Sequence, residues 1–223
     1  MNLIEYPDRE MMMIDLANQL AGELRSCVAL HDHASFAVPG GTTPGPVFDT
    51  LSATNLTWEN IHVLLTDERW VPEESPRSNT RLIRERLLTG RAAMAQYVPL
   101  YAETETPEES LATLSGPLAD EIPISVLLLG MGADGHIASL FPGADKLTEA
   151  LAGDAPPLMA MRAPGAEEPR VTLTGPVLAG AMSTHIVITG AEKRETLEAA
   201  RHATAEEMPV RVVWSDAKVH WAE

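Results

Sequence analysis

Hydrophobic and polar positions along the chain predict helices and strands in alternation. Apolar residues recur at helical spacing over residues 8–30, where Asp8 stands in position to cap the helix N-terminus. Short apolar runs bounded by polar or glycine-rich stretches predict strands at 34–38, 61–67 and 124–130. We predict further strands at 97–101, 170–174, 184–190 and 209–214, one strand inside the loop-rich stretch 151–169, and helices that reach about Ser52 and span 79–90, 107–120, 137–141 and 190–203.

This alternation predicts a single α/β domain. Strands that alternate with helices form a parallel sheet covered by helices on both faces. The 223 residues suit one domain of this class and contain no internal repeat or linker, so we expect one domain over residues 1–223. In such sheets a ligand binds at the carboxyl ends of the strands, where the strand order reverses. Four segments follow predicted strands: PGGTTP (39–44), TDERW (66–70), GMGADGH (130–136) and TGAEK (189–193).

Composition narrows the classes of partner. The formal net charge is −16 and the pI is near 4.8, so the surface repels nucleic acid and anionic membranes, and we expect neither as a partner. Cys27 is the only cysteine, which excludes an intramolecular disulfide and favours a reducing compartment. No signal-peptide pattern and no apolar run of the roughly 18 residues needed for a membrane span is present, so we predict a cytoplasmic protein.

The segment GMGADGH contains the glycine spacing of a dinucleotide-binding turn, but its context favours another chemistry. It comes past the middle of the chain, and the helix predicted over 137–141 stops at Pro142, whereas the nucleotide motif opens the first βα unit and leads into a long helix. If the segment binds no dinucleotide, its glycines serve to leave room for the side chains of Asp134 and His136. An Asp that orients a His is a recurring acid–base pair. A capping Asp beside a packed His is the structural alternative.

The other three segments carry the groups that an anionic ligand needs. Gly40, Gly41 and Thr42 stand where a strand turns into a helix, which suits either a phosphate cradle or a tight turn capped by Thr42 or Thr43. Asp67, Arg69 and Asn79 follow a strand end and form either a ligand site or a solvated charged loop. Arg170 and Lys193 lie at the edges of predicted strands, and each is either part of a phosphate pocket or a surface cation. The pair His31 and His33 lacks the companions of a metal site, and we expect no metal.

Together these separated motifs resemble the 6-phosphogluconolactonase family, in the branch related to glucosamine-6-phosphate deaminase. PGGTTP is similar to the family's S-G-G-[ST]-T-P turn, and TDERWVP with the later Ser-Asn is similar to T-D-E-R-x-V-P…S-N. GMGADGHIASLFPG is similar to G-M-G-x-D-G-H-T-A-S-L-F-P, with Ile137 in place of the usual Thr. The later stretches PRVTLT and TGAEK also match, so the resemblance covers nearly the whole chain.

The resemblance implies a fold, a reaction and a role for each site residue. The fold would be Rossmann-like, with a mainly parallel sheet between helices, similar to glucosamine-6-phosphate deaminase, ribose-5-phosphate isomerase and CoA transferase. The chain would be a carboxylic ester hydrolase of the oxidative pentose phosphate pathway, opening 6-phospho-D-glucono-1,5-lactone without a cofactor, as a monomer or weak homodimer. His136 would activate water, held by Asp134, and Arg69 would polarise the lactone carbonyl. The phosphate would contact Gly40, Gly41, Thr42, Arg170 and Lys193, and the sugar Asp67 and Asn79.

Two other functions remain open at the level of the sequence. A sugar-phosphate isomerase or deaminase on the same fold would use Asp67 to remove a proton next to a carbonyl, and ammonia release or aldose–ketose conversion would reveal it. A non-catalytic sugar-phosphate sensor is the second alternative, although the chain has neither a helix-turn-helix segment nor a basic patch for DNA.

Overall fold

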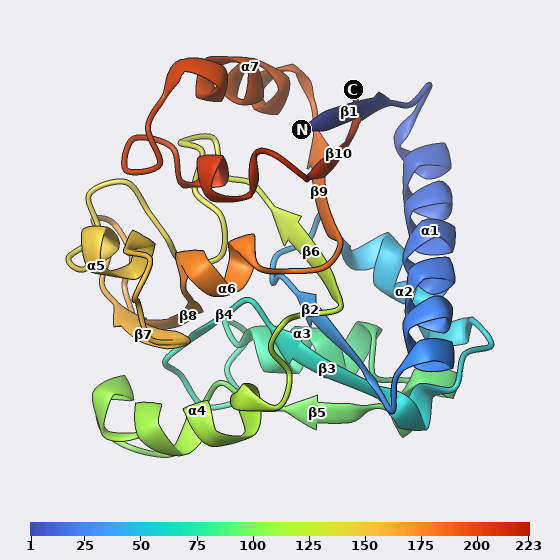
Figure 1. The fold of residues 1–223 in the computed structure, drawn as a ribbon, viewed down its shortest axis with the longest axis horizontal. Coiled ribbons are helices and arrows are strands. Elements are labelled where there is room, and N and C mark those ends of the chain that lie inside the picture. The colour runs from blue at the N-terminus through green and yellow to red at the C-terminus, as the bar shows by residue number, and fades with distance from the viewer.

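The computed structural model describes all residues from 1 to 223, and they form a three-layer α/β domain (Figure 1). The strands are β1 (Asn2–Glu5), β2 (Ala34–Val38), β3 (Ile61–Leu65), β4 (Asp67–Arg69), β5 (Gln96–Val98), β6 (Val126–Gly130), β7 (Leu158–Met161), β8 (Arg170–Leu173), β9 (Thr184–Thr189) and β10 (Lys218–Ala222). The α-helices are α1 (Arg9–Leu30), α2 (Gly45–Ala53), α3 (Asn79–Arg86), α4 (Leu111–Ala119), α5 (Leu147–Leu151), α6 (Gly175–Ala179) and α7 (Ala191–Ala199). Short 3₁₀ turns include η3 (Pro107–Glu109), which leads into α4, and η5 (Pro209–Val213).

Seven strands form a parallel sheet in the order β1-β10-β9-β6-β2-β3-β5. Every residue of β2 is buried, as expected for a central strand of a sheet covered on both faces. From β2 the chain continues to β3 on one side, and it later returns to place β6 on the other side. The strand order therefore reverses between β2 and β6, which is where the sequence argument expects a ligand.

The helix α1 packs along one face of this sheet, beside α2, and begins at its predicted cap. Asp8 accepts a hydrogen bond from the amide of Met11 at 2.8 Å, which satisfies one of the free N–H groups at the helix start. Leu16, Leu20 and Leu24 repeat at four-residue spacing and are fully buried. Each contributes about 1.5–3 kcal/mol through burial, so this stripe holds the helix on the sheet. Figure 1 shows α1 and α2 on the right of the sheet and α6 and α7 on the other side.

A second, antiparallel sheet of β4, β8 and β7 lies beside the first, and the hydrophobic pattern of the sequence does not predict it. The strand predicted over 61–67 breaks at Thr66. The Thr66 amide donates to Val38 in the first sheet, while its carbonyl accepts from Leu173 of β8, both at 2.9 Å. Thr66 thereby joins the two sheets, and Asp67 enters the second one.

Two other predictions about local structure are wrong, and the structure decides against a threonine cap that the sequence left open. The strand predicted over 209–214 is absent, and residues 209–213 form the 3₁₀ turn η5, because Pro209 supplies the fixed backbone angle that suits the start of a helical turn. The last strand is β10. Residues 137–141 form a tight turn closed by an Ile137–Leu140 bridge, not a helix, with Ala138 at a positive φ of 49°. Pro44 precedes α2 without any side-chain cap, so neither Thr42 nor Thr43 caps that helix.

A buried polar network links β10, its neighbour β9 and the residue after the edge strand β1 to α1. His220 of β10 bonds to His185 of β9 and to the hydroxyl of Tyr6, each at 2.9 Å, and His185 in turn meets Glu23 of α1 at 2.9 Å. Burial, together with the neighbouring His185, lowers the pKa of His220 to about 4. His220 is therefore neutral in the folded protein at pH 7.

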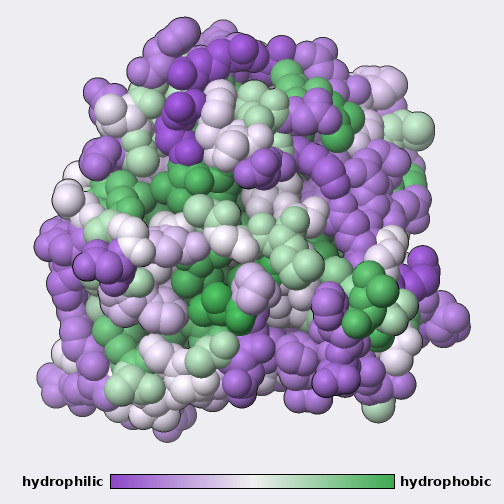
Figure 2. Space-filling view, viewed as in Figure 1, coloured by the Kyte–Doolittle hydropathy of each residue, from purple (hydrophilic) through white to green (hydrophobic).

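The surface carries the excess of acidic residues. Figure 2 shows hydrophilic residues over α1 and along much of the rim of this face, with apolar areas between them. None of the helices combines the length and apolar character required to cross a bilayer.

Candidate active site

A cavity of about 390 Å³ opens between the carboxyl ends of β2 and β6. Loops from both sheets and the start of α7 contribute to its wall. Most of the predicted site residues share it, although they come from five separate segments of the chain. The lining consists of Pro39, Gly40, Gly41, Asp67, Arg69, Asn79, Gly130, Met131, Gly132, His136, Ala138, Phe141, Arg170 and Lys193.

His136 and Asp134 form a hydrogen-bonded pair at this cavity. His136 Nδ1 lies 2.6 Å from Asp134 Oδ1, and the same carboxylate oxygen accepts from the His136 amide at 3.1 Å. Burial raises the pKa of Asp134, but these two bonds outweigh it and lower the pKa overall. An ionised Asp134 holds the proton on Nδ1, which leaves the Nε2 lone pair free to accept a proton. Phe141 packs against the imidazole, with ring centroids 4.2 Å apart, and restricts its orientation.

The glycines of GMGADGH make room for this pair. A Cβ on Gly132 would lie 2.0 Å from His136 Nδ1 and 2.5 Å from Asp134 Oδ1, so no other residue fits there without displacing the pair. Gly135 has a φ of +79°, and a Cβ there would lie 2.9 Å from Met208. The spacing that resembles a nucleotide fingerprint thus serves the Asp–His geometry, and no long helix follows it.

Asp67 is buried at the cavity wall and held by several neighbours. Its Oδ2 accepts from the hydroxyl of Ser139 at 2.6 Å, and its Oδ1 accepts from Thr66 at 3.1 Å. The guanidinium of Arg170 lies 3.8 Å from Oδ2. Ser139 was not predicted as a site residue, although it lies three residues after His136 in the same motif, where the turn that replaces the expected helix directs it toward Asp67.

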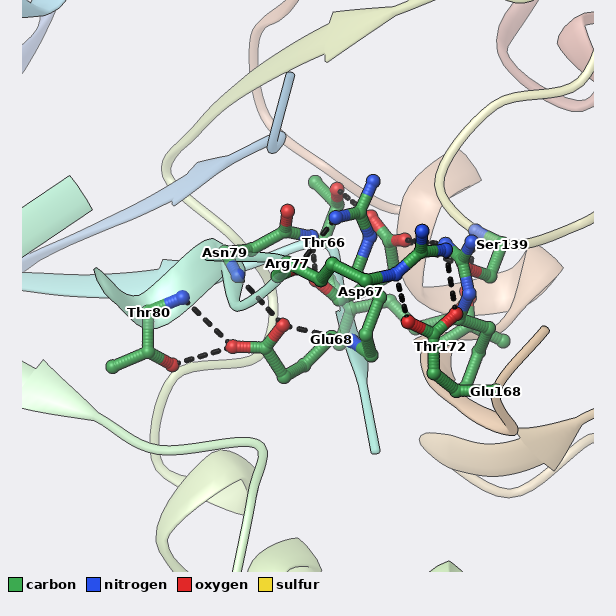
Figure 3. Close-up of polar contacts among 12 residues, drawn as sticks. Thr66, Asp67, Glu68, Arg77, Asn79, Thr80, Ser139, Glu168 and Thr172 are labelled. Atoms are coloured by element: carbon green, nitrogen blue, oxygen red, sulfur yellow. Dashed lines mark hydrogen bonds and ion pairs between the residues drawn. The ribbon is translucent and has the colours of Figure 1, made fainter. Parts of the chain in front are cut away.

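Glu68 organises the segment that carries Asp67 and Arg69. Its fully buried carboxylate accepts from the amides of Arg69, Asn79 and Thr80 at 2.7–2.8 Å. The hydroxyls of Ser78 and Thr80 donate to it as well. Figure 3 shows the Glu68 carboxylate directed at the first residues of α3. A carboxylate at a helix N-terminus is favoured by the helix dipole, so Glu68 fixes α3, and with it Asn79, against the cavity.

Three cations face the cavity with little compensation from protein acceptors. The Nε atoms of Arg69 and Arg170 are buried without a hydrogen-bond partner. Arg69 donates from Nη1 to the carbonyl of Arg77, while Arg170 lies over the Phe141 ring, 5.6 Å from its centroid. Burial lowers the pKa of Arg170, Asp67 opposes this effect and Arg69 adds to it. The side chain of Lys193, near the start of α7, has neither an ion pair nor a hydrogen bond.

Unpaired buried donors are costly unless an acceptor arrives. A protein of net charge −16 therefore concentrates positive charge here, which suits an anionic ligand.

The turn after β2 brings two of its three predicted site residues to the cavity. Gly40 and Gly41 line the cavity, and Gly41 has a φ of +83°. A Cβ on Gly40 would lie 2.0 Å from Asn79 Oδ1, so glycine allows Asn79 to approach. Asn79 is fixed in turn by donating to the carbonyl of Asp67 at 3.0 Å. Thr42 lies outside the cavity lining and borders a neighbouring hollow next to α1.

Comparison with known proteins finds relatives that match nearly the whole chain. A family described as glucosamine-6-phosphate isomerases/6-phosphogluconolactonase matches residues 7–221. A 6-phosphogluconolactonase of Rhizobium meliloti is 42% identical over 93% of this chain and 92% of its own, and one of Mesorhizobium japonicum is 39% identical over 97% and 93%. The crystal structure of a 6-phosphogluconolactonase from Shewanella baltica superposes with a TM-score of 0.95 at 29% identity, covering 100% of this chain and 97% of its own.

Proposed function

The chain belongs to the family of glucosamine-6-phosphate isomerases and 6-phosphogluconolactonases, and we propose that it hydrolyses 6-phospho-D-glucono-1,5-lactone to 6-phospho-D-gluconate in the pentose phosphate pathway. One observation carries the proposal beyond the family. An oriented Asp–His pair and three incompletely compensated cations line the same cavity. The Asp–His pair can activate water, and the cations can hold a phosphorylated substrate.

In the proposed mechanism His136 is the general base. Its Nε2 removes a proton from a water molecule as the water oxygen bonds to the lactone carbonyl carbon. The negative charge that develops on the carbonyl oxygen is stabilised by the Arg69 guanidinium. When the ring C–O bond breaks, the protonated imidazole returns its proton to the leaving ring oxygen. The immediate products are a carboxylic acid and a free hydroxyl, and the acid then ionises to the carboxylate by releasing its proton to solvent. Asp134 stabilises the imidazolium between the two proton transfers.

A lactone of this type is an activated ester, so the proposed catalytic demand is small. One general base contributes about 10²–10⁴-fold in rate, and electrostatic stabilisation of the oxyanion adds to it. This is consistent with the absence of the G-x-S-x-G motif of serine hydrolases from the sequence.

The proposed phosphate site lies on the cationic side of the cavity. Arg170 and Lys193 supply charge-assisted hydrogen bonds, and the backbone amides of Gly40 and Gly41 add donors from the turn after β2. Asp67 and Asn79 face the sugar hydroxyls. Because Thr42 does not line the cavity, this proposal gives it no substrate contact.

Other aspects of the proposal concern the setting of the enzyme. We propose that residues 1–223 work as one domain, in the cytoplasm, as a monomer or weak homodimer, and that hydrolysis needs no cofactor. The ligand class is a phosphorylated sugar lactone, for which the cations of the cavity provide the charge complement.

The geometry weighs against the isomerase or deaminase alternative. In that reaction Asp67 would be the base, but the residue is only 6% exposed, and its carboxylate contacts Ser139, Thr66 and Arg170. That carboxylate already accepts two hydroxyl protons and faces a guanidinium, so it is not free to approach a substrate carbon. His136, by contrast, has an uncommitted ring nitrogen at the cavity.

A direct assay tests the proposal. Purified protein is mixed with freshly generated 6-phospho-D-glucono-1,5-lactone, and lactone disappearance is followed against the spontaneous rate. We expect a protein-dependent acceleration that saturates with substrate and that is absent with glucosamine-6-phosphate, from which no ammonia is released. A rate equal to the spontaneous background, or ammonia release at a comparable rate, would overturn the proposal.

A further inference from the structure

A second cluster of chemically active side chains lies at the opposite edge of the main sheet. His33 immediately precedes β2, His62 is the second residue of β3, and Glu121 follows α4 on the way to β6. These positions are at or near the amino ends of the strands, whereas the catalytic cavity lies at their carboxyl ends. The side chains converge: His33 Nε2 is 3.3 Å from Glu121 Oε2, and His62 Nδ1 is 2.7 Å from Glu121 Oε1.

Glu121 is an unusual residue to find in this position. Only 4% of its side chain is exposed, and its Oε2 is buried without a hydrogen-bond partner. A buried carboxylate is costly unless it is paired and fully hydrogen-bonded. His62 satisfies one oxygen, and the other faces His33 without forming a hydrogen bond. The unsatisfied oxygen therefore points to a positive partner between the three side chains.

The two histidines are arranged to share such a partner. Their rings stack with centroids 4.2 Å apart and planes 15° apart, so each presents a nitrogen to Glu121 from the same side. One ligand atom from each residue lies within 4.8 Å of those from the others. Two stacked imidazolium ions would repel each other, whereas two neutral imidazoles and one carboxylate form a donor set of charge −1.

We propose that His33, His62 and Glu121 form a binding site for a divalent metal ion, with Zn²⁺ as the ion that the donor set selects. Two imidazole nitrogens and one carboxylate oxygen are ligands that zinc prefers. At bond lengths of about 2.0–2.1 Å, tetrahedral ligands lie about 3.4 Å from one another. The 3.3 Å between His33 Nε2 and Glu121 Oε2 already matches this spacing, and His62 Nδ1, which lies 2.7 Å from the other carboxylate oxygen, would move away from that oxygen to reach it.

An ion can reach this site from solvent. A surface hollow of about 500 Å³ borders His33 and Glu121 and continues along Asp120 and Ile122. His33 is about one-third exposed, and His62 is partly exposed. The net charge of −16 attracts cations to the surface as a whole. A fourth position of the ion would be open to water on this side.

The site would act on structure and not on the reaction. The ion would tie together the segments that lead into β2, β3 and β6, which are neighbours in the sheet. The ligands are far apart in the sequence, which is why His31 and His33, considered alone, gave no metal prediction. The inference is independent of the proposed lactonase activity, because none of the three residues lines the catalytic cavity.

Zinc binding by the intact protein tests the inference. Apo protein, prepared with a chelator that is then removed, is titrated with Zn²⁺ by calorimetry, and Co²⁺ is added separately to detect the visible absorption of a tetrahedral site. The variants are Glu121→Gln, which keeps the shape and removes the charge, and His33→Ala, which changes a partly exposed residue. The matched controls are His31→Ala, in the same hollow, and His136→Ala, which removes the imidazole of the catalytic cavity.

We expect one zinc ion per wild-type chain, retained in both control variants. In Glu121→Gln and His33→Ala the affinity should fall by more than the roughly 10–100-fold typical of losing a group that only orients a ligand. Zinc at 100 times its Kd should raise the wild-type Tm by about 5–10 °C and leave the Tm of the ligand variants unchanged. Lactone hydrolysis by Glu121→Gln and His33→Ala, measured in chelator, should match that of the wild type.

Two results would overturn the inference. One is the absence of zinc binding by the wild type at micromolar concentrations. The other is zinc binding that is unchanged in His33→Ala and Glu121→Gln but lost in His136→Ala, which would place the ion in the catalytic cavity. If Glu121→Gln does not fold, His33→Ala decides the question alone, since its side chain is partly in solvent.

Discussion

Lys193 offers the sharpest test of how this cavity recognises its substrate. Its ammonium lines the cavity, has no protein partner, and lies in a molecule whose net charge of −16 repels phosphate. If Lys193 binds the phosphate as proposed, Lys193→Ala removes one charge-assisted hydrogen bond, worth about 1.5–3 kcal/mol. Since about 1.4 kcal/mol corresponds to a factor of ten, kcat/KM should fall by about 10–150-fold. The loss should appear chiefly in KM, because the phosphate is bound equally in the ground and transition states.

The assay compares two substrates and two variants. The unphosphorylated lactone, D-glucono-1,5-lactone, lacks the phosphate that we propose Lys193 binds, so its slow hydrolysis should change little in Lys193→Ala. Lys146→Ala is the matched control, because it removes the same single charge from an exposed position that faces Glu108 and lies outside the cavity. It should leave the hydrolysis of both lactones within about twofold of the wild type, since a distant exposed charge is screened by salt.

The reasoning fails if Lys193→Ala lowers the rate on both lactones by the same factor, since Lys193 would then act on the reaction and not on the phosphate. It also fails if Lys146→Ala has the same effect on KM as Lys193→Ala, since the field of the whole molecule would then account for the loss.

Three further predictions concern the base, its support and the buried histidines. His136→Ala should lower kcat by about 10² or more in a protein with wild-type circular dichroism, and near-normal turnover would contradict the assigned base. Glu68→Gln should destabilise the fold by about 1–3 kcal/mol in urea unfolding, because a carboxylate with five donors becomes an amide with a single acceptor oxygen; an unchanged midpoint would refute this. The pKa of His220 is about 4 in the folded protein, below the unfolded value near 6.5. The neutral His220 therefore contributes about 3 kcal/mol to the free energy of unfolding above pH 6.5, and this contribution is lost as the pH falls toward 4. His220→Gln should flatten the pH dependence of the free energy of unfolding in that range.

The parts of the site that could be predicted from the sequence are those that follow strand ends. Gly40, Arg69 and His136 are far apart in the chain, yet they come within six residues of the ends of β2, β3 and β6. Lys193 lies near the start of α7, which follows β9. The alternation of apolar runs gave that edge, and the rule for parallel sheets placed a ligand there. Asp134 was predicted from its spacing to His136, and the 2.6 Å contact is the local geometry expected of that spacing.

The parts that could not be predicted depend on contacts between remote segments. Glu68 occupies the centre of its charged segment, and nothing in that segment distinguishes a buried carboxylate from a solvated one. Thr66 looks like the continuation of a strand, but competing hydrogen bonds to Val38 and Leu173 divide it between two sheets. The grouping of His33, His62 and Glu121 likewise requires the sheet order, which hydrophobic periodicity does not contain.

The sheet order also constrains how the chain can be made. β10 lies between β9 and β1, so β1, synthesised first, has no hydrogen-bonding partner until residues 218–222 arrive. Figure 1 shows both chain ends at this edge. During translation β1 therefore stays unpaired until β10 is made, whereas β2, β3, β5, β6 and β9 can pair in the order in which they leave the ribosome. A nascent chain stalled before β10 would expose two open edges, β9 and the waiting β1, and would depend on chaperones to avoid pairing with its neighbours.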